Sequence, residues 1–172
     1  VYTEVPDNET PIVGIAADPE ATQNSINICF KQDVTPLYVR ATFLGPVEDY
    51  IKGVIAQMAN QRFSDLVKKP NAPFTSASMD MGDFIVAKTK DAVNFDASFK
   101  EGAWEPALKA LTAEIVRIRK YGFNKSEYDR AKKDFLVSIK NLYNERDKRK
   151  NDAWANEYVQ YFINGGYLMD IA

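Results

Sequence analysis

The stretch VEDYIKGVIAQMANQRFSDLVKKPNAPF, residues 47–74, is typical of one long amphipathic helix that ends at a Pro-Asn-Ala-Pro stop. At about 100° per residue, its apolar stripe comprises Val47, Ile51, Val54, Ile55, Met58 and Leu66. Arg62 falls on the middle of this stripe, and burying an unpaired guanidinium costs several kcal/mol. We therefore expect Arg62 to be mostly buried and bonded to a carboxylate or to loop carbonyl groups. Glu114 and Asp18 are the first acids to consider, and the pair could be structural or could anchor a substrate carboxylate.

The chain before this helix carries two strand patterns. A short apolar run predicts a strand at about residues 12–17, and residues 25–31 alternate between apolar and polar side chains, as half-buried strands do. Residues 33–45 leave two interpretations open, a short edge strand or a loop anchored by apolar side chains. Residues 1–10 are polar and contain proline, so we expect a linker there.

Further strands and then helices follow the long helix. Residues 74–81 and 84–88 predict two strands joined near Gly82 and Asp83, and a third run alternates over about residues 93–99. An apolar stripe then predicts a helix from about residue 103, which ends at Gly122 because glycine readily adopts the left-handed conformation of a helix stop.

A second helical region starts at a clear local signal. Asn124 can cap the helix while Glu127 bonds back to the amide of Asn124, with apolar residues in the flanking staple positions. We expect a helix to about residue 148, a kink within the charged run at residues 144–152, and a second segment to about residue 163.

This order of elements indicates an α+β fold with a largely antiparallel sheet and long helices packed on one face. At 172 residues, the chain is long enough for a substantial core. It begins without Met and ends in an apolar run, so we expect a segment of a longer protein in which residues 11–172 form a single domain.

Composition excludes several functions. The net charge of −2 argues against a nucleic-acid surface, and no apolar run approaches the roughly 20 residues that a membrane span needs. The sequence contains no His, so Ser-His and Cys-His pairs cannot form and zinc ligands reduce to carboxylates and Cys29, which reads as a buried strand thiol. We expect no catalytic and no metal-binding residue in this chain.

A few polar and aromatic groups remain as candidates. Asp80 with Asp83, or Asp18 with Glu20, could form an acid–base or metal pair, but nothing in the sequence fixes either pair on one face with a third ligand. Turn formation explains Asp18 and Asp83 equally well. The charged run at residues 144–152 could be a solvated helix face with pairs such as Glu145–Arg149, or a docking surface for a neighbouring domain or a polar substrate. The possible contact residues are Arg146, Arg149 and Tyr158. Tyr158, with Trp154, Tyr161 and Phe162, could instead be core packing of a terminal helix.

Three stretches together resemble the insulinase-like (pitrilysin) family of zinc metallopeptidases. They are DPEATQNSINICFK (residues 18–31), MANQRFSDLVKKPNAPFTSAS (residues 58–78) and YGFNKSEYDRAKKDFLVSIKNLYNERDKRKNDAWANEYVQYF (residues 121–162). The resemblance covers about residues 11–165 and is greatest to the non-catalytic second domain of large bacterial members. It implies a fold of the mitochondrial processing peptidase-like metallohydrolase type.

The resemblance carries no catalytic role onto this chain. The family's catalytic domain has an inverted His-x-x-Glu-His motif and a distal Glu that hold zinc, and this sequence lacks His. The resemblance implies a wall of a peptide-binding chamber in a bacterial zinc endopeptidase, with zinc in another domain. The expected partners are the other domains of the same polypeptide and a peptide substrate, and the expected location is the periplasm or cell envelope. The alternatives are a catalytically inactive scaffold homologue or a protein-binding module.

Overall fold

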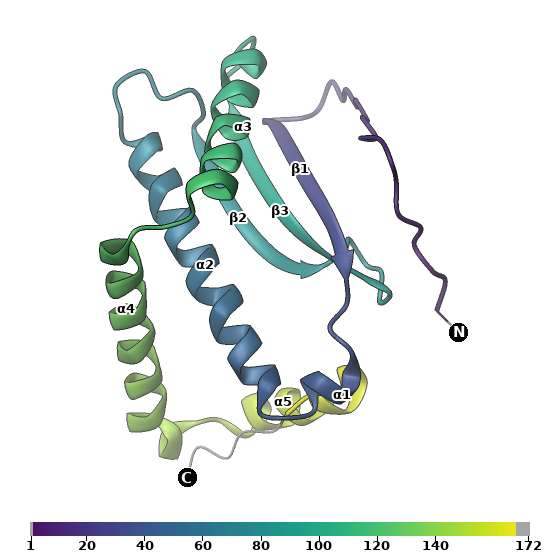
Figure 1. The fold of residues 1–172 in the computed structure, drawn as a ribbon, viewed down its shortest axis with the longest axis vertical. Coiled ribbons are helices and arrows are strands. Elements are labelled where there is room, and N and C mark those ends of the chain that lie inside the picture. Colours follow the sequence, from purple (N-terminus) through teal and green to yellow (C-terminus); the bar gives the residue numbers. More distant parts are fainter. Residues whose placement is uncertain (1, 168–172) are drawn as a thin grey trace. The chain divides into compact units, whose positions relative to one another are not determined.

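The computed structural model describes residues 2–167. Its elements in chain order are β1 (Asn24–Asp33), α1 (Leu37–Arg40), α2 (Leu44–Val67), β2 (Ser76–Asp83), β3 (Lys90–Phe99), α3 (Trp104–Tyr121), α4 (Lys125–Asn144), the 3-10 helix η1 (Arg146–Lys148) and α5 (Asn151–Asn164) (Figure 1). The chain divides into two compact units. The first comprises Val1–Val34 and Met58–Phe123, and the second comprises Thr35–Gln57 and Asn124–Ala172.

The first unit is built on a three-stranded antiparallel sheet with the order β1-β3-β2. Directly opposite residues in antiparallel strands share a face, so the register defines two faces. The covered face carries Ile26, Ile28, Phe30, Ala77, Met79, Met81, Val93, Phe95 and Ala97. The open face carries Ser25, Asn27, Cys29, Lys31, Ser76, Ser78, Asp80, Asn94, Asp96 and Ser98. The sequence-based expectation of an α+β fold with an antiparallel sheet is confirmed.

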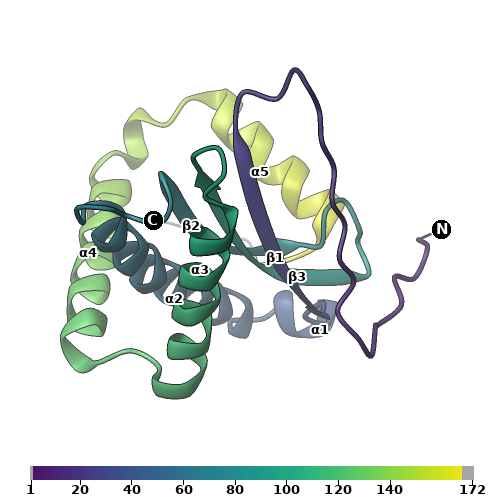
Figure 2. The ribbon, with the colours of Figure 1, turned by 90° about the horizontal axis from the view of Figure 1, so that it is seen from above.

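The apolar core of this unit lies between the covered face and two helices. Phe63 of α2 is fully buried and makes edge-to-face contacts with Phe74 and Phe95. Leu111 of α3 is also fully buried, and α3 packs against β1 and β3 (Figures 1 and 2). Burying a large aromatic or aliphatic side chain contributes about 1.5–3 kcal/mol, so this cluster is the main source of stability for the unit.

A single side chain fastens α2 to β2. The Asn60 amide donates to the Met79 carbonyl oxygen at 2.9 Å, and its own carbonyl oxygen accepts the Met79 N–H at 2.7 Å. Met79 is buried opposite Phe95. These two bonds therefore fix where β2 lies along the helix and place Met79 in the core.

The second unit is helical and holds α1, the first part of α2, α4, η1 and α5. Val54 and Ala131 are its buried apolar side chains among the described residues. Tyr50 of α2 packs edge-to-face on Phe135 of α4 at 4.8 Å between ring centroids. The hydroxyl groups of Tyr50 and Tyr128 lie 3.3 Å apart, so this side of the unit is held by aromatic and polar contacts rather than by a deep core.

The start of α4 shows the full capping box expected from the sequence. The Asn124 side chain accepts the Glu127 N–H at 3.0 Å, and the Glu127 carboxylate accepts the Asn124 N–H at 2.7 Å. Each bond satisfies a backbone donor that the first turn of a helix leaves without an intrahelical partner.

Replacing Asn124 by alanine should therefore destabilise the protein by about 1 kcal/mol, within a range of roughly 0.5–2 kcal/mol. Chemical denaturation of the two proteins measures the difference. Asn124→Ser keeps a capping oxygen and should recover most of the loss. Equal stability of the alanine variant and the parent would contradict a role for this cap.

Several local expectations were wrong. Residues 12–17 form no strand in the described chain, and Ile15 is 94% exposed. Residues 84–88 are a loop in which Ile85 has a φ of 57°, because β2 continues to Asp83 and pairs across this loop with β3. Ile51 of the expected apolar stripe is half-exposed.

The structure decides the conformation of two regions for which the sequence supported no single prediction. Residues 33–45 contain the short helix α1 rather than an edge strand. The expected kink is a break in the helix, because α4 ends at Asn144 and η1 separates it from α5.

No helix in the described part of the chain combines the length and apolar character needed to cross a membrane.

Candidate functional site

The open face of the sheet presents a row of paired polar side chains. Asn27 donates to Asp96 at 2.9 Å across β1 and β3, and Asn94 donates to Asp80 at 3.1 Å across β3 and β2. Both pairs hold a carboxylate on the surface with one amide partner, and serines continue the row at the ends of the strands. Such a face can hydrogen-bond a polypeptide and attract a cationic side chain, but it offers no nucleophile paired with a base.

Cys29 lies on the same face and stays a thiol. Burial raises its pKa because it disfavours the thiolate, and the carboxylates of Asp80 and Asp96 add to this effect against the opposing charge of Lys31. The thiol is therefore a poor nucleophile at neutral pH, and Cys29 lies on a strand as expected but is only partly buried.

One end of the open face is bound by the segment at residues 3–7. Lys90, which is 8% exposed, contacts Asp33 at 2.6 Å and Asp7 at 2.9 Å. Lys31 donates to the carbonyl oxygen of Pro6 at 2.5 Å, and the Val5 N–H donates to the Thr89 hydroxyl at 3.2 Å. These contacts hold the segment on the sheet.

The Lys90 cluster makes the binding of this segment depend on pH. The hydrogen bond from Lys90 lowers the pKa of Asp7 below its usual 3.8, and hydrogen bonds to Asp33 and Asp7 raise the pKa of Lys90 above its usual 10.5. A carboxylate with a lowered folded pKa stabilises above its unfolded pKa and loses this effect as the pH falls through its folded pKa. A lysine with a raised folded pKa stabilises below its unfolded pKa and loses this effect at higher pH.

We therefore expect residues 3–7 to detach locally as the pH falls below 3.8. The NMR signal of the Val5 amide, which is bonded to Thr89, should move to its unfolded position with a midpoint below that value. Asp7→Asn should abolish the separate transition, whereas Asp18→Asn should leave it unchanged because Asp18 only accepts the local Glu20 N–H. A Val5 signal that moves only with global unfolding would contradict this expectation.

Arg62 lies against a carboxylate and a helix end in the first unit. Its guanidinium contacts Glu114 at 3.2 Å and donates to the Gly122 carbonyl oxygen at 2.9 Å. The Phe123 ring stacks below it at 4.6 Å from the guanidinium carbon to the ring centroid. The two charged side chains are 12% and 6% exposed, so the pair is largely desolvated. Of the two acids proposed as partners, Glu114 is the one in contact.

The charged run between α4 and α5 brings two of the proposed contact residues to one place. Arg149 pairs with Glu157 at 2.5 Å and stacks on the Trp154 ring at 4.2 Å, so it does not pair with Glu145 as the helical spacing suggested. The Tyr158 ring also stacks on the Trp154 ring, with 6.4 Å between the two ring centroids. Trp154 is thus the centre of this cluster.

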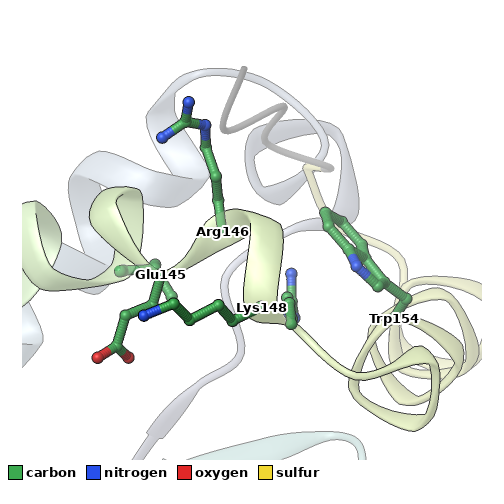
Figure 3. Close-up of a pocket in the computed structure, with 6 residues that line it drawn as sticks. Glu145, Arg146, Lys148 and Trp154 are labelled. Carbon is green, nitrogen blue, oxygen red and sulfur yellow. The ribbon is translucent and has the colours of Figure 1, made fainter.

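Arg146 belongs to a shallow pocket beside this cluster. The pocket has a volume of about 350 Å³ and is lined by Leu142, Glu145, Arg146, Lys148, Arg149 and Trp154 (Figure 3). Arg146 donates to the Tyr143 carbonyl oxygen at 2.9 Å and stacks on the Tyr143 ring. Because both arginines already have partners, the pocket is a polar surface feature rather than a built anion site.

The remaining sequence candidates are not brought together into one site. Asp18 forms a local turn with Glu20, and Asp83 pairs with Lys88 at 2.7 Å. Within residues 2–167, no group of three or more His, Cys, Asp or Glu side chains could hold a metal ion. The residues present therefore do not fit a zinc site. Sequence reasoning missed the Lys90 cluster, since it depends on pairings between residues far apart in the chain that no local spacing reveals.

The sequence matches no protein-family model and no curated protein. Solved structures do resemble it. The periplasmic protease PqqL from Escherichia coli aligns with a TM-score of 0.72 and 17% identity over 88% of this chain and 16% of PqqL. The structure of the first half of PqqL gives a TM-score of 0.73 with 32% of that chain covered. A predicted insulinase-family protease from Yersinia pestis gives 0.68 and 12% identity, with coverage of 88% and 32%.

The chain has the fold of an insulinase-type protease domain. It spans about a sixth of PqqL and about a third of the other two chains. The similarity lies in the arrangement of helices and strands, since identity is 17% or below.

Proposed function

We propose that this chain is a non-catalytic domain of a zinc-dependent bacterial endopeptidase. The observation that carries the proposal is the fold, which matches periplasmic protease PqqL over 88% of this chain but over only 16% of PqqL. Peptide-bond hydrolysis by a zinc-activated water would take place in another domain of the same polypeptide, because a sequence without His cannot supply a His-x-x-Glu-His motif. Periplasmic location belongs to the same proposal.

The open face of the sheet is the part that we assign to the peptide. Outside the end that residues 3–7 bind, where Ala92 and Lys90 are buried, its side chains are mostly polar. Asn27, Asp80, Asn94 and Asp96 offer donors and acceptors to a polypeptide backbone. The covered face and the helices would then support the wall of the chamber. Arg62 would act only within that support, since Glu114 and Gly122 already occupy its donors.

The other proposed contacts are with neighbouring domains. Arg146, Arg149 and Tyr158 lie on the second unit at and beside the pocket, and Tyr158 is 56% exposed. A surface that combines arginines with stacked aromatic rings is typical of protein interfaces. We propose that residues 11–172 form the domain, that residues 1–10 lead into it, and that this surface faces another part of the polypeptide.

Zinc and peptide assays on two proteins test this function. The isolated 172-residue chain should bind no stoichiometric zinc by metal analysis and should cleave no peptide. The polypeptide of the full reading frame should cleave peptides in a chelator-sensitive way. Zinc-dependent cleavage by the isolated chain would overturn the non-catalytic assignment, and a full polypeptide without a His-x-x-Glu-His motif would favour the scaffold instead.

Charge reversal on the open face should weaken substrate binding in the full polypeptide. Asp96→Lys is expected to raise KM for a lysine-rich peptide up to about fivefold with little change in kcat, because an exposed charge contributes about 1 kcal/mol or less. Asp49→Lys, on the exposed surface of α2, provides the charge-matched control and should leave KM unchanged. If Asp96→Lys and Asp49→Lys had the same KM, Asp96 would not be part of the proposed substrate-binding surface.

A further inference from the structure

The segment at residues 11–17, PIVGIAA, leaves its apolar side chains in solvent. Ile12 and Val13 are 81% exposed and Ile15 is 94% exposed, and the segment lies outside the three strands. Side chains of this type are favoured in strands, and a contiguous exposed apolar run is typical of an interaction surface.

Both ends of this segment are held in the first unit. Residues 3–7 are bound at one end of the sheet by Lys31, Thr89 and Lys90. On the other side, the Ala21 N–H donates to the Asp18 carbonyl oxygen at 3.1 Å in a turn that leads into β1. The segment therefore runs between two fixed points beside a sheet whose β1 strand is at an edge, and yet it does not join that sheet (Figure 1).

Its residue pattern differs from that of its own sheet. Side chains alternate between faces along a strand, so Ile12, Gly14 and Ala16 would form one row and Val13, Ile15 and Ala17 the other. Neither row contains a polar side chain. In the middle of β1, in contrast, the apolar residues Ile26, Ile28 and Phe30 lie on the covered face and alternate with Ser25, Asn27, Cys29 and Lys31 on the open face. Pairing with β1 would therefore add an apolar row to a solvated face, and pairing with β1 of a second copy would do the same.

We propose that residues 11–17 form a β-strand at the edge of a sheet that is covered on both faces and belongs to another domain of the same polypeptide. Continuous apolar strands are typical of sheets covered on both sides, and an added strand gains backbone hydrogen bonds along its whole length. The inference rests on the proposed function only in requiring that further domains exist, as the 16% coverage of PqqL suggests.

Hydrogen exchange measured by mass spectrometry tests the strand. In the isolated 172-residue chain, the amides of residues 12–17 should exchange at nearly the unprotected rate. In the full polypeptide, the same amides should exchange at least about 100-fold more slowly, as amides in paired strands do. Val13→Asp in the full polypeptide should restore fast exchange, whereas Val86→Asp, at a loop position that is 86% exposed, should not.

Three results would contradict the proposal that residues 11–17 form this strand. Fast exchange in both proteins would show that no partner sheet exists. Protection in the isolated chain would indicate pairing with its own β1, and protection that rises with protein concentration would indicate a second copy. Peptidase activity of the same full polypeptide is scored separately, so an active enzyme with an unprotected segment refutes this inference and leaves the proposed function standing.

Discussion

Replacing Arg62 by alanine is expected to lower the free energy of unfolding by about 3–5 kcal/mol, which is the usual cost of leaving one member of a buried ion pair without its partner. The Glu114 side chain, 6% exposed, would keep only the peripheral contact with Arg117 at 3.5 Å. The Gly122 carbonyl oxygen would also lose its donor. Urea denaturation followed by circular dichroism measures the loss.

Two further variants separate the effect of the ion pair on stability from the effect of side-chain packing. Arg117→Ala is the matched control, because its side chain is 61% exposed and its removal should cost less than about 1 kcal/mol. The double variant Arg62→Met with Glu114→Leu removes both charges and should be much more stable than Arg62→Ala, since similar replacements of buried pairs are often neutral. A single Arg62→Ala variant within about 0.5 kcal/mol of the parent would refute the role of the pair.

Replacing Phe63 by alanine is expected to cost about 3–5 kcal/mol, the range measured for buried aromatic side chains truncated to alanine. Phe63 is 0% exposed and touches the rings of Phe74 and Phe95, which lie at 6.4 and 6.3 Å between centroids. Truncation would remove both edge-to-face contacts and open a cavity between α2 and the sheet.

Phe63→Leu provides the matched control for volume. It retains an apolar side chain, so it should cost distinctly less than Phe63→Ala. The same denaturation experiment compares the two. If both variants lost the same stability, the ring contacts rather than the cavity would set the cost, and a loss below about 1 kcal/mol for Phe63→Ala would mean that this core is not the one that holds the sheet.

Local signals in the sequence predicted the elements that depend on short spacing. The alternation at residues 25–31 marks β1, and Asn124 with Glu127 forms the cap at the start of α4. The misplaced charge of Arg62 pointed to a carboxylate partner, and Glu114 lies there. In each case the relevant physics acts within a few residues or follows from one desolvated charge.

Features set by distant pairing could not be predicted in the same way. Residues 84–88 are as apolar as a strand, but the register of Asp83 opposite Asp91 leaves them in the connecting loop. The polar open face became visible only when the register joined Asn27 to Asp96. The cluster around Trp154 formed because the helix breaks after Asn144, which turns Arg149 toward Glu157 instead of Glu145.

The bond pair between Asn60 and Met79 also affects how the sheet meets other proteins. The N–H and carbonyl groups of Met79 are the ones that an additional strand would use beside β2, and the Asn60 amide already occupies both. Unpaired strand edges are templates for aggregation, and natural proteins block them with local devices. One asparagine on α2 thus closes the middle of this edge to edge-to-edge association and helps to keep the domain from polymerising through β2.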